Sequence, residues 1–155
     1  MKKTVLREYA RLIVRMGVNV QKGQDVVIYA DLDQPEFVAM VVEEAYKAKA
    51  REVTVEWNYP ALTKYHVRYQ SLKTLSTVED WQIEKRKHQV ETLPCRIHLI
   101  SDDPDGLKGV NVEKMQKANL ARMKVRKPYR DAMENKYQWT IVAVPSAKWA
   151  KKVFP

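Results

Sequence analysis

The sequence predicts an α/β fold with an open, mostly parallel sheet of about four strands and helices on both faces. Short runs rich in Val, Ile and aromatic residues have the length of strands, and the stretches between them repeat apolar residues at helical spacing. Because the two kinds of segment alternate along the chain, consecutive strands are expected to run parallel, with right-handed helical crossovers between them.

Residues 17–58 contain the clearest strand–helix–strand unit. Strands are expected at 25–30 (DVVIYA) and 52–57 (EVTVEW). Between them, Phe37, Val41, Ala45 and Ala48 recur at helical spacing, and Pro35 suits the first helical position. The rest of the chain can be interpreted as additions to this unit.

The remaining elements follow from the same patterns. An amphipathic helix is expected over 4–16, ending at Gly17, and a helical stretch over 61–93, in two pieces broken near 76–77, with Thr77 and Asp80 resembling a capping signal. A third strand is expected at 95–101 and a fourth at 139–144. A helix over 111–135 should be kinked or divided by Pro128, and a short helix should follow Ser146.

Composition limits the class of protein. The chain has 155 residues, 45% of them hydrophobic and 30% charged, which suits one globular domain. No run approaches the roughly 18 apolar residues of a membrane helix. Cys95 is the single cysteine, which excludes an internal disulfide and agrees with a reducing compartment. A cytoplasmic location is therefore expected.

The formal net charge of +9 permits binding to nucleic acid or to an anionic membrane. The basic residues are, however, spread over many segments and interleaved with acidic ones. The densest clusters, at 85–87 and 122–130, lie in stretches with helical patterns. This distribution favours a solvated surface over a nucleic-acid interface.

Several common catalytic and phosphate-binding motifs are absent. The sequence contains neither GxGxxG nor the P-loop, HExxH or GxSxG pattern. Cys95 begins an apolar strand, where a buried, unreactive thiol is expected. Cys95 and His98 should point to opposite faces of that strand, so they do not form a catalytic pair.

One group of residues carries a hypothesis about a site. In open α/β sheets, ligands bind beyond the carboxyl ends of the strands. The residues that follow the expected strands there, and that are candidates for lining a cleft, are Asp31, Asp33, Asn58, Tyr59, Asp102 and Asp103. Carboxylates gathered at this edge can bind a metal or an amine. The alternative is that they are turn residues and helix caps.

Four segments resemble one family in order and in sequence. They are GVNVQKGQDVVIYA, EFVAMVVEEAYKAKAREVTVEW, ISDDPDGLKGV and QWTIVAVPSAKWAKKVFP. Together they resemble the N-terminal part of the thermophilic metallo-aminopeptidases, the group of aminopeptidases T, S and PepS. One departure is Lys49, where the resemblance leads us to expect a glycine at the helix end.

The resemblance implies a two-domain, usually dimeric exopeptidase that removes N-terminal residues from peptides. It implies two divalent metal ions (zinc, cobalt, manganese or magnesium), with the metal ligands and the catalytic residues in the C-terminal half. No catalytic or metal-binding residue is therefore expected in this segment. Residues 1–155 would form an N-terminal domain, inactive alone, that walls the substrate chamber.

The partners implied are peptide substrates, the protein's own C-terminal domain and a second copy of the chain, with no membrane and no specific nucleic acid. An alternative from the residues alone is a free-standing α/β module that binds a nucleotide or nucleic acid. A receiver-like switch using Asp31 and Asp102 is a further alternative.

Overall fold

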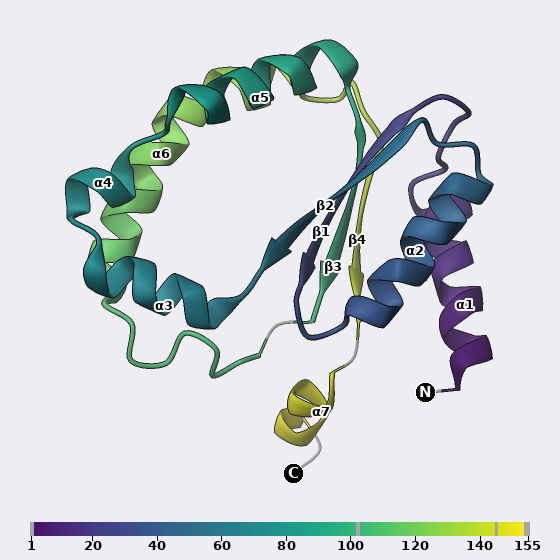
Figure 1. Cartoon of the computed structure of the whole chain (residues 1–155), viewed down its shortest axis with the longest axis horizontal. Coiled ribbons are helices and arrows are strands. Elements are labelled where there is room, and N and C mark those ends of the chain that lie inside the picture. Colours follow the sequence, from purple (N-terminus) through teal and green to yellow (C-terminus); the bar gives the residue numbers. More distant parts are fainter. Residues whose placement is uncertain (1, 102, 145, 154–155) are drawn as a thin grey trace. The chain divides into compact units, whose positions relative to one another are not determined.

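The computed structural model of the chain describes residues 2–101, 103–144 and 146–153 (Figure 1). It contains two compact units. One consists of Met1–Asn58, Pro94–Pro104 and Tyr137–Pro155, and the other of Tyr59–Leu93 and Asp105–Lys136. We call them the sheet unit and the helical unit and describe each by itself.

The sheet unit holds all the strands of the described residues. Its elements, in chain order, are α1 (Lys3–Leu12), the π-helical turn η1 (Ile13–Gly17), β1 (Asp25–Asp31), α2 (Pro35–Lys47), β2 (Glu52–Asn58), β3 (Cys95–Ile100), β4 (Trp139–Ala143) and α7 (Ala147–Val153).

These strands form one sheet in the order β2-β1-β3-β4, and every pair of neighbours is parallel. The register places Ile28 between Val55 and Ile97, at the centre of the sheet. The prediction of an open, mostly parallel sheet of about four strands is confirmed. Consecutive strands need crossovers in such a sheet, and α2 supplies the one between β1 and β2.

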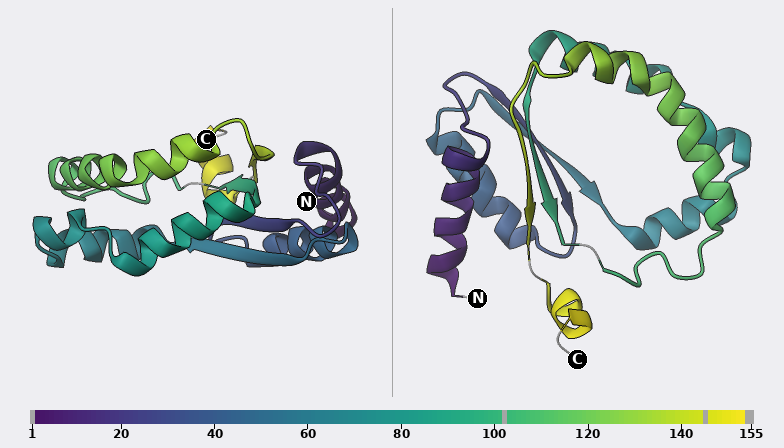
Figure 2. Two further views of the ribbon diagram at one scale, coloured as in Figure 1. Left: turned by 90° about the horizontal axis from the view of Figure 1, so that it is seen from above. Right: turned by 180° about the vertical axis from the view of Figure 1, so that it is seen from behind.

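The core lies on one face of this sheet, under α1 and α2 (Figure 2). Residues Val26, Ile28 and Ile97 point into it from the strands. The apolar repeat of α2 meets them, and the ring of Phe37 stacks on Tyr9 of α1 with 5.7 Å between ring centroids. The Tyr9 hydroxyl also donates a hydrogen bond of 2.8 Å to the carbonyl of Ala143 at the end of β4. The helical periodicity identified in the sequence therefore marks the buried face.

The opposite face of the sheet has a different character. Tyr29, His98 and Ile141 share it by register. The rings of Tyr29 and His98 stack at 4.7 Å, whereas Ile141 is 56% exposed and the neighbouring Trp139 is 60% exposed. The expectation of covering helices is thus confirmed for the face under α1 and α2. Partly exposed side chains stand on the other face.

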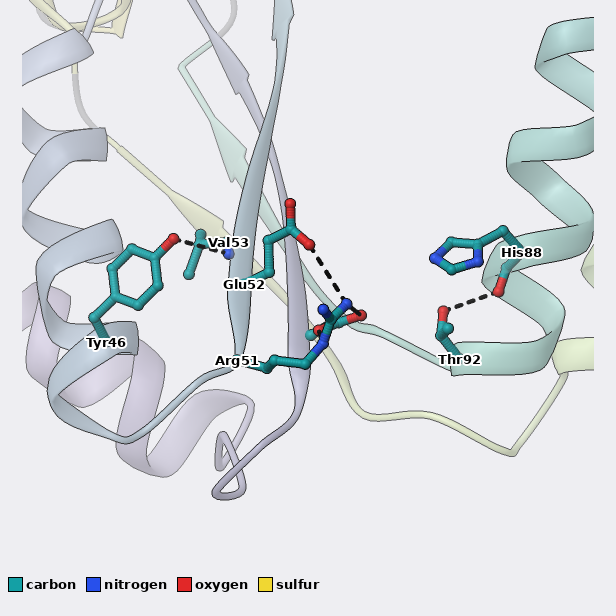
Figure 3. A network of polar contacts seen from close by, with 7 residues as sticks. Tyr46, Arg51, Glu52, Val53, His88 and Thr92 are labelled. Carbon is teal, nitrogen blue, oxygen red and sulfur yellow. Dashed lines mark hydrogen bonds and ion pairs between the residues drawn. The ribbon is translucent and has the colours of Figure 1, made fainter.

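The amino ends of β1 and β2 are joined by a charged contact. The guanidinium of Arg51 donates two hydrogen bonds of 2.6 Å to the carboxylate of Asp25, and it lies 3.4 Å from Glu52 (Figure 3). On the other side of β2, the backbone N–H of Val53 donates to the hydroxyl of Tyr46 at 3.2 Å. These contacts tie the end of α2 and the following loop to the start of the sheet.

The helical unit comprises α3 (Pro60–Tyr69), α4 (Leu72–Ser76), α5 (Asp80–Thr92) and α6 (Val112–Met133). The sequence predicted two helical pieces over 61–93, and the structure has three, because the chain also breaks at Gln70 and Ser71. The cap of α5 is Glu79 rather than Thr77, and its backbone N–H donates to the side-chain oxygen of Gln82.

Helix α6 is continuous through Pro128. Of the two outcomes expected at Pro128, a kink or a division of the helix, the division does not occur, and α6 follows a curved course in Figure 2. Proline removes one backbone donor and crowds the preceding turn, and the 22-residue helix tolerates this local cost without ending. None of the helices in the described residues is long and apolar enough to cross a membrane.

Candidate functional site

The carboxyl ends of β1, β2 and β3 bring several predicted site residues together. Asp31 and Asn58 are register partners at the ends of β1 and β2. The Asn58 side-chain amide donates a hydrogen bond of 2.5 Å to a carboxylate oxygen of Asp31. One backbone bond closes the same corner, since the Leu32 N–H donates to the Asn58 carbonyl at 3.0 Å. The side chains of these two residues thus form a polar pair across the strand ends.

A second pair joins the loop after β1 to the end of β3. The hydroxyl of Ser101 donates a hydrogen bond of 2.5 Å to a carboxylate oxygen of Asp33. Ser101 is only 6% exposed, so this contact lies below the surface of the edge. The sequence placed Asp33 here but missed Ser101, because a serine at the end of an apolar run looks like the start of any turn. The one sequence feature that could have identified Ser101 as an edge residue is its position at the end of the strand segment CRIHLIS.

The other predicted edge residues have different outcomes. Asp103 follows β3 and belongs to the sheet unit, whereas Tyr59 precedes the first residue of α3 and belongs to the helical unit. Asp102 lies outside the described residues. The structure therefore joins Asp31 to Asn58 and Asp33 to Ser101, and their role in lining a cleft stays a prediction.

Two surface hollows lie elsewhere. One, of about 760 Å³, runs along α1 and is lined by residues that include Val5, Leu12 and Met16. The other, of about 490 Å³, lies within the helical unit between α3 and the start of α6, where the Lys114 ammonium donates to the carbonyls of Val67 and Gln70 at 2.6 and 2.5 Å. Of the predicted edge residues that the structure describes, none lines either hollow.

The titratable groups of β3 are positioned as the strand alternation predicted. Cys95 is fully buried in the core, and this burial raises the pKa of its thiol to about 12. His98 points to the opposite face, where burial and then the charge of Arg96 lower the pKa of its imidazole. Because nucleophilic attack needs the thiolate, Cys95 is unreactive at neutral pH, as expected from the sequence.

Comparison with known proteins decides the family. The sequence profile of the family described as "Thermophilic metalloprotease (M29)" matches residues 2–155. The chain belongs to the M29 family. The resemblance inferred from the four sequence segments is therefore confirmed.

Individual relatives of known name align with nearly the whole length of this chain. It is 35% identical to aminopeptidase AmpS of Bacillus subtilis (strain 168) over 151 residues, which are 97% of this chain and 37% of that protein. It is 32% identical to aminopeptidase PepS of Streptococcus thermophilus over 99% of its own length and 37% of the relative's. The solved structure of wild-type AmpT from Thermus thermophilus superposes with a TM-score of 0.86 at 30% identity, covering 99% of this chain and 39% of that one.

The chain therefore spans less than two fifths of the length of these M29 relatives, over an N-terminal portion of them. Superposition over 99% of the chain shows that the M29 fold of this portion includes both the sheet unit and the helical unit.

The name of the M29 family implies a metal ion. The side chains of this chain that could coordinate a metal ion are therefore relevant. Within the described residues, no group of three or more His, Cys, Asp or Glu side chains is arranged to hold a metal ion. At the carboxyl edge, Asp31 and Asp33 accept hydrogen bonds from two uncharged side chains, those of Asn58 and Ser101. These residues do not fit a metal centre, and we assign no metal-dependent step to them.

Proposed function

We propose that this chain forms the N-terminal portion of a metal-dependent aminopeptidase, an enzyme that hydrolyses N-terminal residues from peptides. The observation that carries the proposal is the 35% identity to aminopeptidase AmpS across 97% of the chain, supported by the superposition on AmpT. Both relatives are longer than this chain. In the proposal, two divalent metal ions, such as zinc, cobalt, manganese or magnesium, are held by the part of the enzyme that this chain does not span.

The portion described here is proposed to be non-catalytic. Its contribution is to wall the substrate chamber and to position the catalytic portion, as a two-domain enzyme requires. The polar pairs Asp31–Asn58 and Asp33–Ser101 are proposed to face the chamber, because ligands of open α/β sheets bind beyond the carboxyl ends of the strands. A homodimer and a cytoplasmic location belong to the same proposal. The single buried cysteine supports a reducing compartment.

A chimera tests this proposal. The 155-residue chain replaces the corresponding N-terminal portion of Bacillus subtilis AmpS, and hydrolysis of aminoacyl-p-nitroanilides is measured with zinc, cobalt or manganese. We expect metal-dependent turnover by the chimera and none by the 155-residue chain alone. The matched control is AmpS lacking that portion, which should be inactive because its substrate chamber is incomplete.

Two results would count against the proposal. Metal-dependent turnover by the purified 155-residue chain would show that the portion is itself catalytic. A chimera that is folded by circular dichroism and binds metal, yet hydrolyses no substrate, would show that this chain does not serve as the N-terminal portion of such an enzyme.

A further inference from the structure

The hollow of about 490 Å³ in the helical unit is lined by charged side chains of one sign. Helix α3 contributes Lys64 and Arg68, and Lys114 stands in the first turn of α6. None of the described residues that line this hollow is acidic. Small-molecule sites typically have volumes of roughly 300–1,000 Å³. The hollow therefore combines the size of a ligand site with a positive lining.

The cations of α3 have no carboxylate close to them in the sequence. Residues 57–78 contain neither aspartate nor glutamate. Within the described residues, no ion pair reaches Lys64 or Arg68. Four lysines of other helices each contact a carboxylate three or four residues away, and they are Lys47, Lys87, Lys117 and Lys127. The charges of α3 are thus left without the neutralisation that these lysines have.

The positive charges of the hollow reinforce one another. Lys64 and Arg68 are four residues apart on α3, so they lie on the same side of the helix and repel each other. The Lys114 ammonium donates to the carbonyls of Val67 and Gln70 at 2.6 and 2.5 Å. These bonds hold the ammonium in place but leave its charge unneutralised, because a carbonyl has no net charge. An anion in the hollow would relieve this repulsion.

An aromatic ring also borders the hollow. Tyr65 lines it and is 58% exposed, although its ring also stacks against that of Tyr69, with 6.3 Å between centroids. The guanidinium of Arg68 lies over the Tyr69 ring, 5.4 Å from its centroid. This contact positions the guanidinium and leaves its N–H donors available for an anion. Charge and an exposed ring therefore occur together on α3.

Gly109 brings bare backbone to the hollow. Its φ is +81°, in the region that favours glycine, and a β-carbon added there would meet no atom within 4 Å. Backbone without a side chain allows a ligand to approach closely. Val67, which also lines the hollow, is only 2% exposed and supplies an apolar surface. The lining therefore suits a ligand that is anionic at one end and flat or apolar at the other.

We propose that this hollow binds a small phosphate ester that carries a planar ring, the chemistry of a mononucleotide. The phosphate, with a charge of about −1.5 to −2 at pH 7, interacts with Lys64, Arg68 and Lys114. A carboxylate carries a single charge and matches three cations less well. The ring of the ligand stacks on Tyr65, as bases do on exposed aromatic side chains. The site lies in the helical unit and is independent of the aminopeptidase proposal.

The test uses the 155-residue chain and AMP as the probe, with inorganic phosphate and adenosine as its two halves. The chain has four glycines, so the Gly109 amide is readily followed by ¹H–¹⁵N NMR. Sodium chloride of equal ionic strength is the reference, and the Gly23 amide, in the sheet unit, is the internal control. We expect a saturable Gly109 shift with AMP and a dissociation constant at least fivefold higher for phosphate or adenosine alone. Chloride should leave both signals in place.

Matched variants locate the site. Lys64→Gln should raise the dissociation constant for AMP at least fivefold. Lys73→Gln removes the same charge from the helical unit at an exposed position outside the hollow, and it should change that constant less than twofold. Tyr65→Leu keeps an apolar side chain but removes the ring, so it should weaken AMP binding at least threefold and change phosphate binding less than twofold. Circular dichroism verifies that each variant is folded.

Four outcomes would overturn the proposal. One is the absence of a saturable Gly109 shift with AMP. Another is AMP binding no tighter than phosphate, which would mean that the ring makes no contact. A third is an equal loss of affinity in Lys64→Gln and Lys73→Gln, which would show that only the overall positive charge acts. The last is a six-nucleotide oligodeoxyadenylate that binds more tightly than AMP at physiological salt and loses affinity in Lys64→Gln, which would assign the hollow to single-stranded nucleic acid.

Discussion

Lys49 occupies a position where the family resemblance predicts a glycine, and it offers a test of backbone strain. The residue ends the turn after α2 with a φ of +71°, in the left-handed region that favours glycine. Its backbone is fixed from both sides. Its N–H donates to the Tyr46 carbonyl at 2.9 Å, and its carbonyl accepts from the Gly23 N–H at 2.8 Å. Lys49 therefore cannot leave this conformation without losing the link between α2 and the turn before β1.

Lys49→Gly should stabilise the protein. A left-handed conformation costs a residue with a side chain about 1–2 kcal/mol. Glycine removes that cost, but it also gives the unfolded chain more conformational freedom. This second effect cancels roughly 0.4–1 kcal/mol of the stabilisation. The net gain in the free energy of unfolding is about 0.5–1 kcal/mol. At this chain length, it corresponds to a rise of roughly 1–4 °C in Tm. Urea denaturation followed by circular dichroism measures the change.

Lys49→Ala is the matched control. It removes the same exposed charged side chain but keeps the β-carbon that makes a positive φ costly. We expect this variant to lie within about 0.5 kcal/mol of the parent, in the usual range of surface substitutions. A Lys49→Gly variant that is no more stable than Lys49→Ala would refute the argument from strain.

Three further predictions concern the sheet unit. Phe37→Ala removes a buried ring stacked on Tyr9 and should lower the free energy of unfolding by about 3–5 kcal/mol in urea titrations; a loss below about 1 kcal/mol would contradict the packing described. Cys95, whose thiol pKa is raised to about 12, should resist a thiol reagent at pH 8 until denaturant is added, and rapid labelling of the native chain would contradict its burial. His98 has a lowered pKa, so the unfolded state takes up its proton first as pH falls below about 6.5. The neutral imidazole of His98 contributes fully to the free energy of unfolding above about pH 6.5. This contribution decreases as pH falls through the pKa of His98 in the folded protein. The decrease should be smaller in His98→Gln, and an equal decrease in both proteins would refute this assignment.

The carboxyl edge of the sheet illustrates where prediction from sequence stopped. Asp31, Asp33 and Asn58 were placed there because each follows a segment with strand character, and local chemistry is enough for that. Their hydrogen-bond partners were not predictable. Ser101 is 68 residues from Asp33 along the chain, and the two meet only because β3 lies next to β1 in the sheet.

The helical unit shows a different limit. The sequence located its helical stretches but not the extra break at Gln70 and Ser71, nor the continuity of α6 through Pro128. A proline weakens a helix by a known amount, but packing along the rest of a 22-residue helix can outweigh that local cost. The 122–130 cluster looked like a solvated basic surface. Burial at the contact between α5 and α6 distinguishes Arg122 and Arg126 from Lys127 and Arg130.

The sequence by itself determined the alternation of strands and helices, the parallel sheet and the membership of the M29 family. These properties depend on the periodicity of apolar residues and on short segments that are each local in the chain. The tertiary structure alone decided the strand order β2-β1-β3-β4, the division into a sheet unit and a helical unit, and the pairing of Asp33 with Ser101. Those properties depend on contacts between residues far apart in the chain, and such contacts exist only once the packed elements bring the side chains together.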